Sequence, residues 1–340
     1  MIEFIDFKPD NQNVWNDYAE KHPHSEVYHL AQWAAIYKET YNYTPYYFFV
    51  REESEIVGIL PLIHQKGLLK NILVTPPAGI LLNNPKKHNE EIFRFVTALK
   101  ENLRASDVLF YKNYKLSPGL YESLENIRIL KQLPETVDAL NKDIGKKRRW
   151  GVRKAEENGL THIVIKPTLQ DIKLFYKIYG TNYRDLGTPV NSEKFFRKQL
   201  EYLGGNIKMF IVFKEDKLIC VKWLLEYKLE ILSSESATLR EFFPTRINDY
   251  QIYHAMKYAI EKGFQTYNMG RSQQESGTYA FKVSWGACQV QPYPVYRTKQ
   301  QSGIAEKKSK FKLFIKAWKK APVAITNIAG PILRKNMTLD

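Results

Sequence analysis

The sequence predicts an α+β fold made of two copies of one unit, each with a mixed, mainly antiparallel sheet flanked by helices. Three observations lead to this prediction. The chain has 340 residues, which suits two domains of ordinary size better than one. Segments with helical periodicity alternate along the chain with segments of strand periodicity. Matching segments of the two halves are separated by a nearly constant number of residues, as duplication of one unit requires.

The first copy is expected within residues 1–135. In chain order, its elements are a helix over 26–37, strands over 45–51, 55–62 and 71–77, a helix over 90–100 and a strand over 107–111. The second of these helices is amphipathic, because Ile92, Phe95, Val96 and Leu99 recur at helical spacing and form one apolar face.

The second copy, expected within residues 136–297, repeats this order after an additional basic helix over 137–158. Its further elements are strands over 206–213, 217–225 and 229–237, a helix over 248–263 and a strand over 264–270. We expect Asn248 to cap the start of that helix and Gly263 to follow its end. Val50 and Val212 lie 162 positions apart, and Ile92 and Ile252 lie 160 apart, which supports the repeat.

The net charge of +15 is concentrated in two segments. Residues 141–154 hold seven basic residues and one acid, and residues 298–340 hold ten basic residues and two acids. These segments therefore contribute +14, and the rest of the chain is almost neutral. Two separate basic segments indicate two anionic partners or surfaces.

Other features exclude several classes of protein. The first ten residues lack a basic region followed by an apolar run, and the chain has no apolar stretch of about eighteen residues, so we expect neither a signal peptide nor a membrane-spanning helix. The two cysteines, Cys220 and Cys288, are far apart and argue against a disulfide framework. The histidines show no metal-binding spacing, so we expect no metal site. A cytoplasmic location is the simplest expectation.

The most distinctive stretch is Y-N-M-G-R-S-Q-Q-E-S-G-T-Y-A-F-K-V-S-W-G, residues 267–286. It begins at the end of a predicted strand, where folds with parallel strands often place ligands. Arg271 beside a glycine can hold an anion, and Lys282 alternates with Phe281 in a strand-like run, so it faces a cleft if Phe281 faces the core. The alternative interpretation is an ordinary hairpin with solvated charges. Glu235 and Asp249 are candidate general bases nearby.

The pattern G-R-S-x4-G-x3-F-K-x2-W-G resembles the closing motif of FemAB-like proteins, which include the Fem peptidoglycan aminoacyltransferases and BioF2-type acyltransferases. The stretches K-K-R-R-W-G-V-R-K-A-E-E-N-G-L, R-D-L-G-T-P-V-N-S-E-K-F-F and E-I-V-G-I-L-P-L are also similar to segments of that family. The resemblance covers about residues 25–297 and implies tandem GNAT-like domains that transfer an acyl or aminoacyl group to an amine. It also implies that Lys282 holds the reacting carbonyl.

The segment before the helix over 248–263 bears on the acyl donor. Acetyl-CoA-dependent GNAT enzymes hold pyrophosphate on a glycine-containing turn at this place, whereas this chain has T-L-R-E-F-F-P-T-R-I-N-D without glycine. Ordinary acetyl-CoA use is therefore disfavoured. No bound cofactor is expected, and aminoacyl-tRNA and acyl-CoA or acyl-carrier protein all remain candidate co-substrates.

The two basic segments have separate interpretations. Lys146, Lys147, Arg149 and Arg153 exceed the local acids and surround Trp150, which suits tRNA or nucleotide phosphates, although a solvated helix face is the simpler alternative. Residues 307–320 place Phe311, Phe314, Ile315 and Trp318 on one helical stripe and Lys308, Lys312, Lys316 and Lys320 on another. This suits an anionic membrane surface, and docking on the second domain is the alternative.

These observations predict a cytoplasmic acyltransferase, peripheral at the inner face of the membrane, that acylates an amine of a cell-envelope glycan or peptidoglycan-type precursor. The predicted catalytic residues are Lys282 and Arg271. The predicted substrate-binding residues are Phe281, Tyr279, Ser272, Asn248, Lys146, Lys147, Arg149 and Arg153. The alternative is a non-catalytic GNAT-like scaffold for nucleic acid or an anionic glycan. A cleft lined by Arg271, Tyr279 and Lys282 would favour the enzyme.

Overall fold

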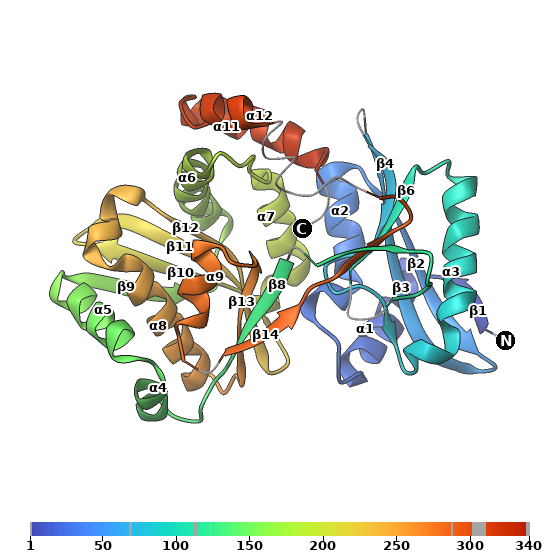
Figure 1. Ribbon diagram of the computed structural model, residues 1–340, viewed down its shortest axis with the longest axis horizontal. Coiled ribbons are helices and arrows are strands. Elements are labelled where there is room, and N and C mark those ends of the chain that lie inside the picture. Colours follow the sequence, from blue (N-terminus) through green and yellow to red (C-terminus); the bar gives the residue numbers. More distant parts are fainter. Residues whose placement is uncertain are drawn as a thin grey trace. The chain divides into compact units, whose positions relative to one another are not determined.

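The computed structural model describes residues 2–67, 70–111, 115–124, 126–286, 288–300 and 311–337 (Figure 1). The chain forms two compact units. The first contains the described residues within Met1–Glu125, Tyr293–Ser309 and Ile332–Asp340, and the second contains those within Asn126–Pro292 and Lys310–Pro331.

The first unit is built on an eight-stranded sheet with the order β1-β2-β3-β4-β6-β15-β7, to which β5 adds beside β3. Its strands are β1 (Ile2–Asp6), β2 (Thr44–Glu52), β3 (Glu55–Lys66), β4 (Asn71–Val74), β5 (Leu81–Leu82), β6 (Asp107–Tyr111), β7 (Tyr121–Ser123) and β15 (Val295–Arg297). Its helices are α1 (Gln12–Lys21), α2 (Gln32–Tyr41) and α3 (Pro85–Asn102), with short 3-10 turns at Pro9–Asn11 and Val27–His29. Only β4 and β6 pair in parallel among the described strands of this sheet.

The second unit is built on a seven-stranded sheet with the order β14-β8-β13-β12-β11-β10-β9. Its strands are β8 (Asn126–Gln132), β9 (Leu160–Ile165), β10 (Ile207–Lys214), β11 (Lys217–Tyr227), β12 (Glu230–Thr238), β13 (Thr266–Gln273) and β14 (Cys288–Pro292). Its helices are α4 (Val137–Asp143), α5 (Lys146–Glu157), α6 (Leu169–Leu186), α7 (Glu193–Leu203), α8 (Ile247–Glu261), α9 (Gly277–Val283), α11 (Lys312–Trp318) and α12 (Val323–Lys335) up to Pro331, with 3-10 turns at Gly204–Asn206 and Arg240–Thr245. The pair β12 and β13 is parallel.

The two units repeat one design, as the sequence predicts. Glu53 in the turn between β2 and β3 has a φ of 54°, and Glu215, 162 positions later, has a φ of 53° in the turn between β10 and β11. The strand pairing shifts by one residue between Val50 and Arg51, and again at the equivalent position in the second unit. A shared bulge and a shared left-handed turn residue fix the register of the duplication.

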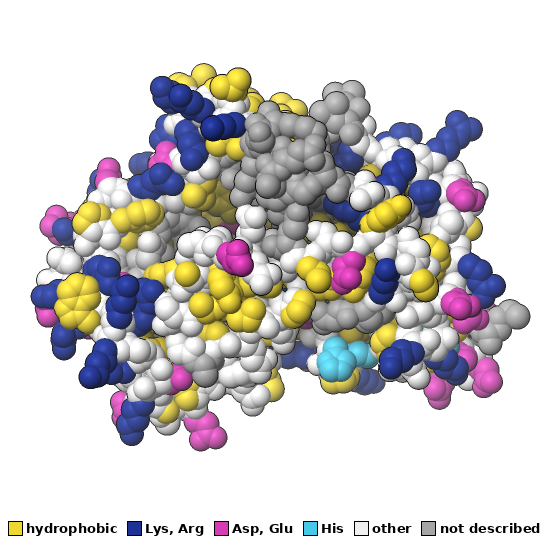
Figure 2. Space-filling model, in the orientation of Figure 1, with side chains coloured by type: hydrophobic (Ala, Val, Ile, Leu, Met, Phe, Trp, Pro, Cys, Tyr) yellow, Lys and Arg dark blue, Asp and Glu magenta, His cyan; other side chains and the backbone are white. Residues whose placement is uncertain are grey.

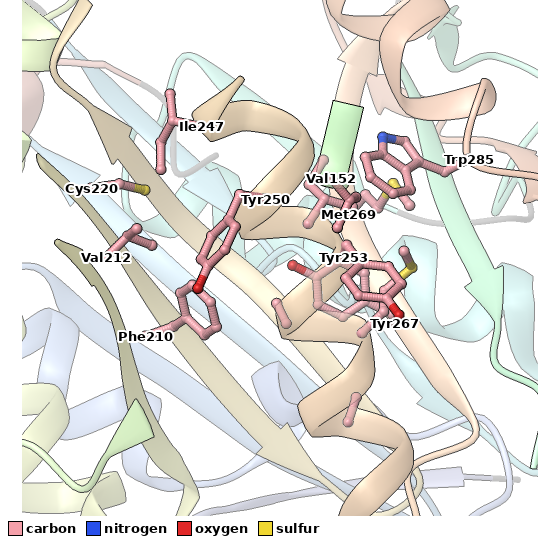
Figure 3. Packing of buried hydrophobic residues seen from close by; sticks show 14 of the residues in the cluster. Val152, Phe210, Val212, Cys220, Ile247, Tyr250, Tyr253, Tyr267, Met269 and Trp285 are labelled. Atoms are coloured by element: carbon pink, nitrogen blue, oxygen red, sulfur yellow. The ribbon is translucent and has the colours of Figure 1, made fainter. Parts of the chain in front are cut away.

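Helices cover both faces of the second sheet (Figure 1). On one face, Val152 and Ala155 of α5 and the buried side chains of α8 pack against β10 and β11. Figure 3 shows Tyr250 and Tyr253 of α8 in this core. On the other face, Phe175 of α6 lies 5.2 Å from Trp223 of β11, measured between ring centroids. The sheet is thus held between two apolar layers.

Several expected elements are corrected. The basic helix expected over 137–158 is two helices, because the chain is extended at Ile144 and Gly145. The helix expected to start at Asn248 starts at Ile247, with Arg246 in the left-handed region as its N-cap. Gly263 follows the end of this helix with a φ of 81°, as expected for the glycine after a C-cap.

The unit boundaries also differ from those expected, because strand pairing rather than chain order defines each sheet. Residues 126–132 are expected in the first domain, but as β8 they pair with β13 and β14 of the second unit. Residues 295–297 are expected in the second domain, but as β15 they pair with β6 and β7 of the first unit. The segment after residue 298 is not one appendage, since its described residues 311–331 cluster with the second unit.

Helix α11 packs on the end of α6 within the second unit. Ile315 lies so close to Gly187 that any larger side chain at Gly187 would collide with it, and Trp318 is buried. Arg184 Nη1 donates to the carbonyl oxygen of Ala321 at 3.1 Å. In contrast, Phe311 and Phe314 are exposed, and Lys308 lies outside the described residues. Of the predicted stripe, Ile315 and Trp318 therefore dock on the second unit, whereas Phe311 and Phe314 face solvent. None of the helices described in the structure is long and apolar enough to cross a membrane.

Candidate active site

The site is created where two parallel strands separate. β12 and β13 pair only from Glu230–Leu232 to Thr266–Asn268. After this point β12 continues beside β11 to Thr238, while β13 continues beside β8. The change of course occurs at Gly270, which has a φ of 70°, a conformation that glycine adopts at little cost. The result is a wedge between the two strands at their carboxyl ends.

A cavity of about 500 Å³ occupies this wedge, within the range of small-molecule sites. Its walls come from β11, β12, β13, α6, α8 and α9 of the second unit. The charged lining residues are Lys222, Glu235, Arg271 and Lys282. The uncharged polar ones are Asn182, Ser233, Ser234, Ser236, Thr238, Asn248, Gln251 and Thr278. The apolar and aromatic ones include Tyr183, Leu186, Phe243, Ile252, Tyr267, Met269 and Phe281.

The structure brings Lys282 and Arg271 to the same cavity. Lys282 lies on α9, a short helix whose Ser276 N-cap side chain accepts from the backbone of Tyr279. The strand-like run expected here is therefore wrong, although Lys282 does reach the cleft. The Lys282 Nζ donates to the carbonyl oxygen of Arg271 at 3.0 Å. Burial, followed by the charges of Lys222 and Arg271, lowers the pKa of Lys282 to about 8.

Phe281 also lines the cavity, so in the helix both members of the F-K pair reach the site. The Arg148 guanidinium stacks on the Phe281 ring at 4.4 Å and fixes the ring from the side. Tyr279 does not line the cavity but packs, half-buried, against the core of the second unit.

Ser272 and Asn248 have different environments. Ser272 is buried in β13 opposite Ile127 and does not line the cavity. Asn248 does line it, and its Oδ1 accepts from Gln251 Nε2 at 2.8 Å. Asn248 is therefore oriented by a neighbour one turn along α8 rather than by a capping interaction.

The four basic residues predicted on α5 are exposed and do not line the cavity: Lys146, Lys147, Arg149 and Arg153. Figure 2 shows Lys and Arg side chains gathered over this part of the second unit. Arg149 Nη1 donates to the carbonyl oxygen of Asn141 at 2.8 Å and also to that of Ile144, so it closes the end of α4. Trp150 is 45% exposed, and the Arg246 guanidinium stacks on its ring.

Arg148, which was not among the predicted site residues, connects three helices. It is buried, and its Nη1 lies 2.6 Å from Asp249 Oδ1 on α8. Its Nε and Nη2 donate to Ser284 Oγ just after α9, at 2.9 and 2.6 Å. Asp249 also pairs with Arg246 and is 3% exposed. The carboxylate of Asp249 is thus committed to the fold and does not serve as the candidate general base.

Glu235 is the candidate base that does line the cavity. Its carboxylate accepts from the Tyr183 hydroxyl and from Asn191 Nδ2, the latter at 3.4 Å. Two hydrogen bonds from α6 and the loop that follows it hold this carboxylate in place at the edge of the wedge.

Lys222 is the main lining residue that sequence reasoning missed. It is 3% exposed on β11, and its Nζ donates to Ser236 Oγ at 3.2 Å and to Ser233 Oγ at 3.3 Å. The signal was present in the sequence, because Lys222 is a single cation within the apolar run L-I-C-V-K-W-L-L. The buried hydroxyl of Tyr267, which also lines the cavity, has no hydrogen-bond partner among the described residues.

Comparisons with known proteins identify a related fold. Residues 143–283 match the family described as acetyltransferase (GNAT) domain. FemX has 15% sequence identity and a TM-score of 0.65 over 92% of this chain and 100% of its own. The chain has a tandem GNAT-like fold, which FemX shares. The resemblance seen in the sequence is thereby confirmed at the level of fold.

Two further structures share this tandem GNAT fold. A tandem GNAT protein from the clavulanic acid biosynthesis pathway is 11% identical, with a TM-score of 0.57 over 89% of this chain and 100% of its own. The C-terminal domain of a putative lysylphosphatidylglycerol synthetase from Agrobacterium fabrum is 13% identical, with a TM-score of 0.57 over 86% of this chain and 92% of its own. No curated protein sequence matches the chain.

The described part of the GNAT domain and of the rest of the chain contains no group of three or more His, Cys, Asp and Glu side chains that could hold a metal ion.

Proposed function

We propose that this protein transfers an acyl or aminoacyl group to an amine, at the wedge between β12 and β13 of the GNAT domain. The observation that carries the proposal is the placement of the Lys282 ammonium in the wedge, where it already donates to a carbonyl oxygen. An ammonium held there can donate in the same way to the carbonyl oxygen of a bound ester or thioester.

The reaction then has a defined course. The acceptor amine attacks the acyl carbon, and the carbonyl oxygen becomes an oxyanion that Lys282 stabilises. The carbonyl re-forms as the C–O or C–S bond of the donor breaks, which leaves an amide and a free alcohol or thiol. The amine loses one proton, which Glu235 on the cavity wall can accept and then return to the departing oxygen or sulfur. Removing an oxyanion donor of this kind costs on the order of 10²–10³ in kcat.

The donor is an aminoacyl-tRNA or another acyl group carried on a thioester, and the acceptor is an amine of a cell-envelope glycan or peptidoglycan-type precursor. A lysylphosphatidylglycerol synthetase domain among the structural relatives supports an aminoacyl donor and an envelope acceptor. The exposed Lys146, Lys147 and Arg153 of α5 suit the phosphates of tRNA. The turn before α8 has no glycine to wrap around pyrophosphate, which argues against ordinary acetyl-CoA use.

We place the enzyme at the cytoplasmic face of an anionic membrane, through the exposed side of α11. Phe311, Leu313 and Phe314 are 58%, 83% and 42% exposed, and Lys312 and Lys316 are exposed beside them. Aromatic and aliphatic side chains between lysines suit the headgroup boundary of a bilayer. Figure 2 shows hydrophobic and basic side chains side by side over α11 and α12.

A non-catalytic scaffold for nucleic acid or an anionic glycan is the alternative, and the exposed cations of α5 would fit it as well. The open cavity favours the enzyme, because Arg271 and Lys282 both line it. Tyr279, the third residue proposed as a discriminator, does not.

The test is to incubate the protein with charged tRNA, acyl-CoA and acyl-carrier protein against pools of amino sugars and lipid-linked precursors, and to look for a mass gain. Lys282→Met should lose activity about 10²-fold or more, whereas Lys262→Met, at the exposed end of α8, should retain it. Circular dichroism checks that both variants fold. If Lys282→Met is as active as the wild type, the proposed role of Lys282 is wrong.

The pH profile gives an independent test. Because burial lowers the pKa of Lys282 to about 8, the ammonium is present below pH 8 and is lost above it. An oxyanion donor therefore predicts that kcat falls with a midpoint near pH 8. A rate that instead rises through this pH would show that Lys282 acts as a base.

A further inference from the structure

Lys222 occupies a position that an apolar residue normally fills. It lies directly opposite Phe210 on β10 and Ser236 on β12, so the three side chains share one face of the sheet. Phe210 belongs to the apolar core of the second unit, and so do Cys220 and Leu224 on the same strand as Lys222. A cation has therefore been built into a row of core residues.

The charge of Lys222 is not neutralised within the described part of the protein. Its Nζ donates only to the hydroxyls of Ser233 and Ser236, and no described carboxylate forms an ion pair with it. Lys282 likewise has no ion pair with a described carboxylate, and the charge of Lys222 is one cause of its lowered pKa. Keeping a buried ammonium without a counter-charge is unfavourable, and two in one cavity repel each other.

The fold itself does not require a lysine here. Leu60 is the equivalent residue of the first unit, 162 positions earlier, and it is fully buried in that unit's core. The same strand, in the same register, is thus stable with a leucine. The lysine of the second unit is then explained by a ligand rather than by packing.

We propose that Lys222 is a substrate-binding residue that holds a phosphate group in the wedge cavity, together with Ser233. The inference rests on the proposed function, because it assigns part of the substrate to the same cavity. The Ser233 hydroxyl accepts from Lys222 and keeps its own hydrogen to donate to a phosphate oxygen. The Ser236 hydroxyl accepts from Lys222 and donates to Gln251 Oε1 at 3.0 Å, so it holds the lysine in place. Arg271 and Lys282 also line the cavity, so its cations outnumber its one carboxylate, Glu235, by three to one. That excess suits a phosphate better than a carboxylate.

The experiment measures binding rather than turnover, on the full-length chain at low ionic strength. Inorganic pyrophosphate and phosphate are titrated while thermal unfolding is followed, and acetate at equal ionic strength is the carboxylate control. Pyrophosphate should raise the melting temperature of the wild type. Lys222→Leu should bind it about tenfold or more weakly, as loss of a charge-assisted hydrogen bond predicts. Lys217→Leu is the matched control, because this exposed lysine lies on the same strand.

Three results would overturn the proposal: an equal rise in melting temperature for Lys222→Leu, an equal rise with acetate, or no rise with either phosphate. A second measurement needs no variant and covers the case in which Lys222→Leu does not fold. Reductive methylation with ¹³C makes the lysine resonances visible, and phosphate bound beside Lys222 should raise the pKa of Lys282. An unchanged pKa in saturating pyrophosphate would contradict the site. Because these tests read binding, a protein that binds phosphate but transfers no acyl group would refute only the proposed reaction.

Discussion

The two units differ most where their parallel strands meet. In the first unit β4 and β6 stay joined beyond their paired residues, because Thr75 N donates to Leu109 O at 3.0 Å and Tyr111 N donates to Thr75 Oγ1 at 3.0 Å. In the second unit the pairing of β12 with β13 stops at Leu232 and Asn268, and a cavity opens. The same arrangement of strands therefore gives either a continuous sheet or a binding site. The residues that follow the parallel strand pair decide which of the two forms.

The cores of the two units show the same contrast in chemistry. Leu60 fills its position in the first unit with apolar surface, whereas Lys222 brings a buried charge to the equivalent position in the second. The first unit is therefore the reference that shows what the fold needs, and the second shows what the site adds.

Replacing each of these two residues by the other type should show the largest difference in unfolding free energy between the two units. Leu60→Lys buries an ammonium in the apolar core of the first unit, among residues such as Phe48 and Leu62, and should cost about 4 kcal/mol or more of unfolding free energy. Lys222→Leu should cost less than about 1 kcal/mol, because it removes a buried charge. Urea denaturation of both variants measures the difference. Similar losses would mean that Lys222 supports the fold.

Removing Arg148 should have the next largest effect. This residue belongs to α5, which precedes β9 in the second unit, and Arg148→Met leaves Asp249 with Arg246 as its remaining ion-pair partner. We expect a loss of about 3 kcal/mol, as when one partner of a buried ion pair is removed. Lys147→Met, on the exposed side of the same helix, should change the unfolding free energy by less than about 0.5 kcal/mol. Equal effects would show that Arg148 is not the connection between the helices.

Loosening the closed strand pair of the first unit should have an intermediate effect. Thr75→Val keeps the shape of the side chain but leaves the buried backbone N–H of Tyr111 without its acceptor, which should cost about 1–2 kcal/mol. Ser233→Ala, the matched change beside the open wedge, should cost less because the cavity admits water to its neighbours. Chemical denaturation followed by tryptophan fluorescence compares the two. A larger loss for Ser233→Ala would contradict the distinction between closed and open strands.

The smallest effect on stability is expected from the tail, which carries the proposed membrane contact. Leu313→Ser should leave the unfolding free energy within about 0.5 kcal/mol, because the side chain is 83% exposed. It should nevertheless weaken co-sedimentation with anionic vesicles at low salt, since each buried methylene contributes about 0.8 kcal/mol. High salt should release the wild type. Unchanged binding of Leu313→Ser would remove α11 from the membrane contact.

The sequence predicted most of the scaffold because the scaffold depends on local periodicity. Ile92 and Val96 are buried on α3, as their spacing required, and the strands over 45–51 and 217–225 lie within β2 and β11. Where an element is short or its hydrophobic pattern is irregular, contacts with other elements decide its secondary structure. The residues around Phe281 show no clear periodicity of helix or strand. They form a helix whose N-terminus is capped by Ser276.

The sequence by itself determined the duplication, the two basic segments and the candidate stretch 267–286, which begins at a strand end and contains Lys282. Only the tertiary structure decided which cations share a site, because Lys222 and Lys282 are 60 residues apart and meet only through the separation of β12 from β13. It also decided that Arg148 and Asp249 belong to the fold, since burial and pairing depend on neighbours from other helices. Periodicity reports which face of an element is buried, whereas the partner of a buried charge is set by how the elements pack.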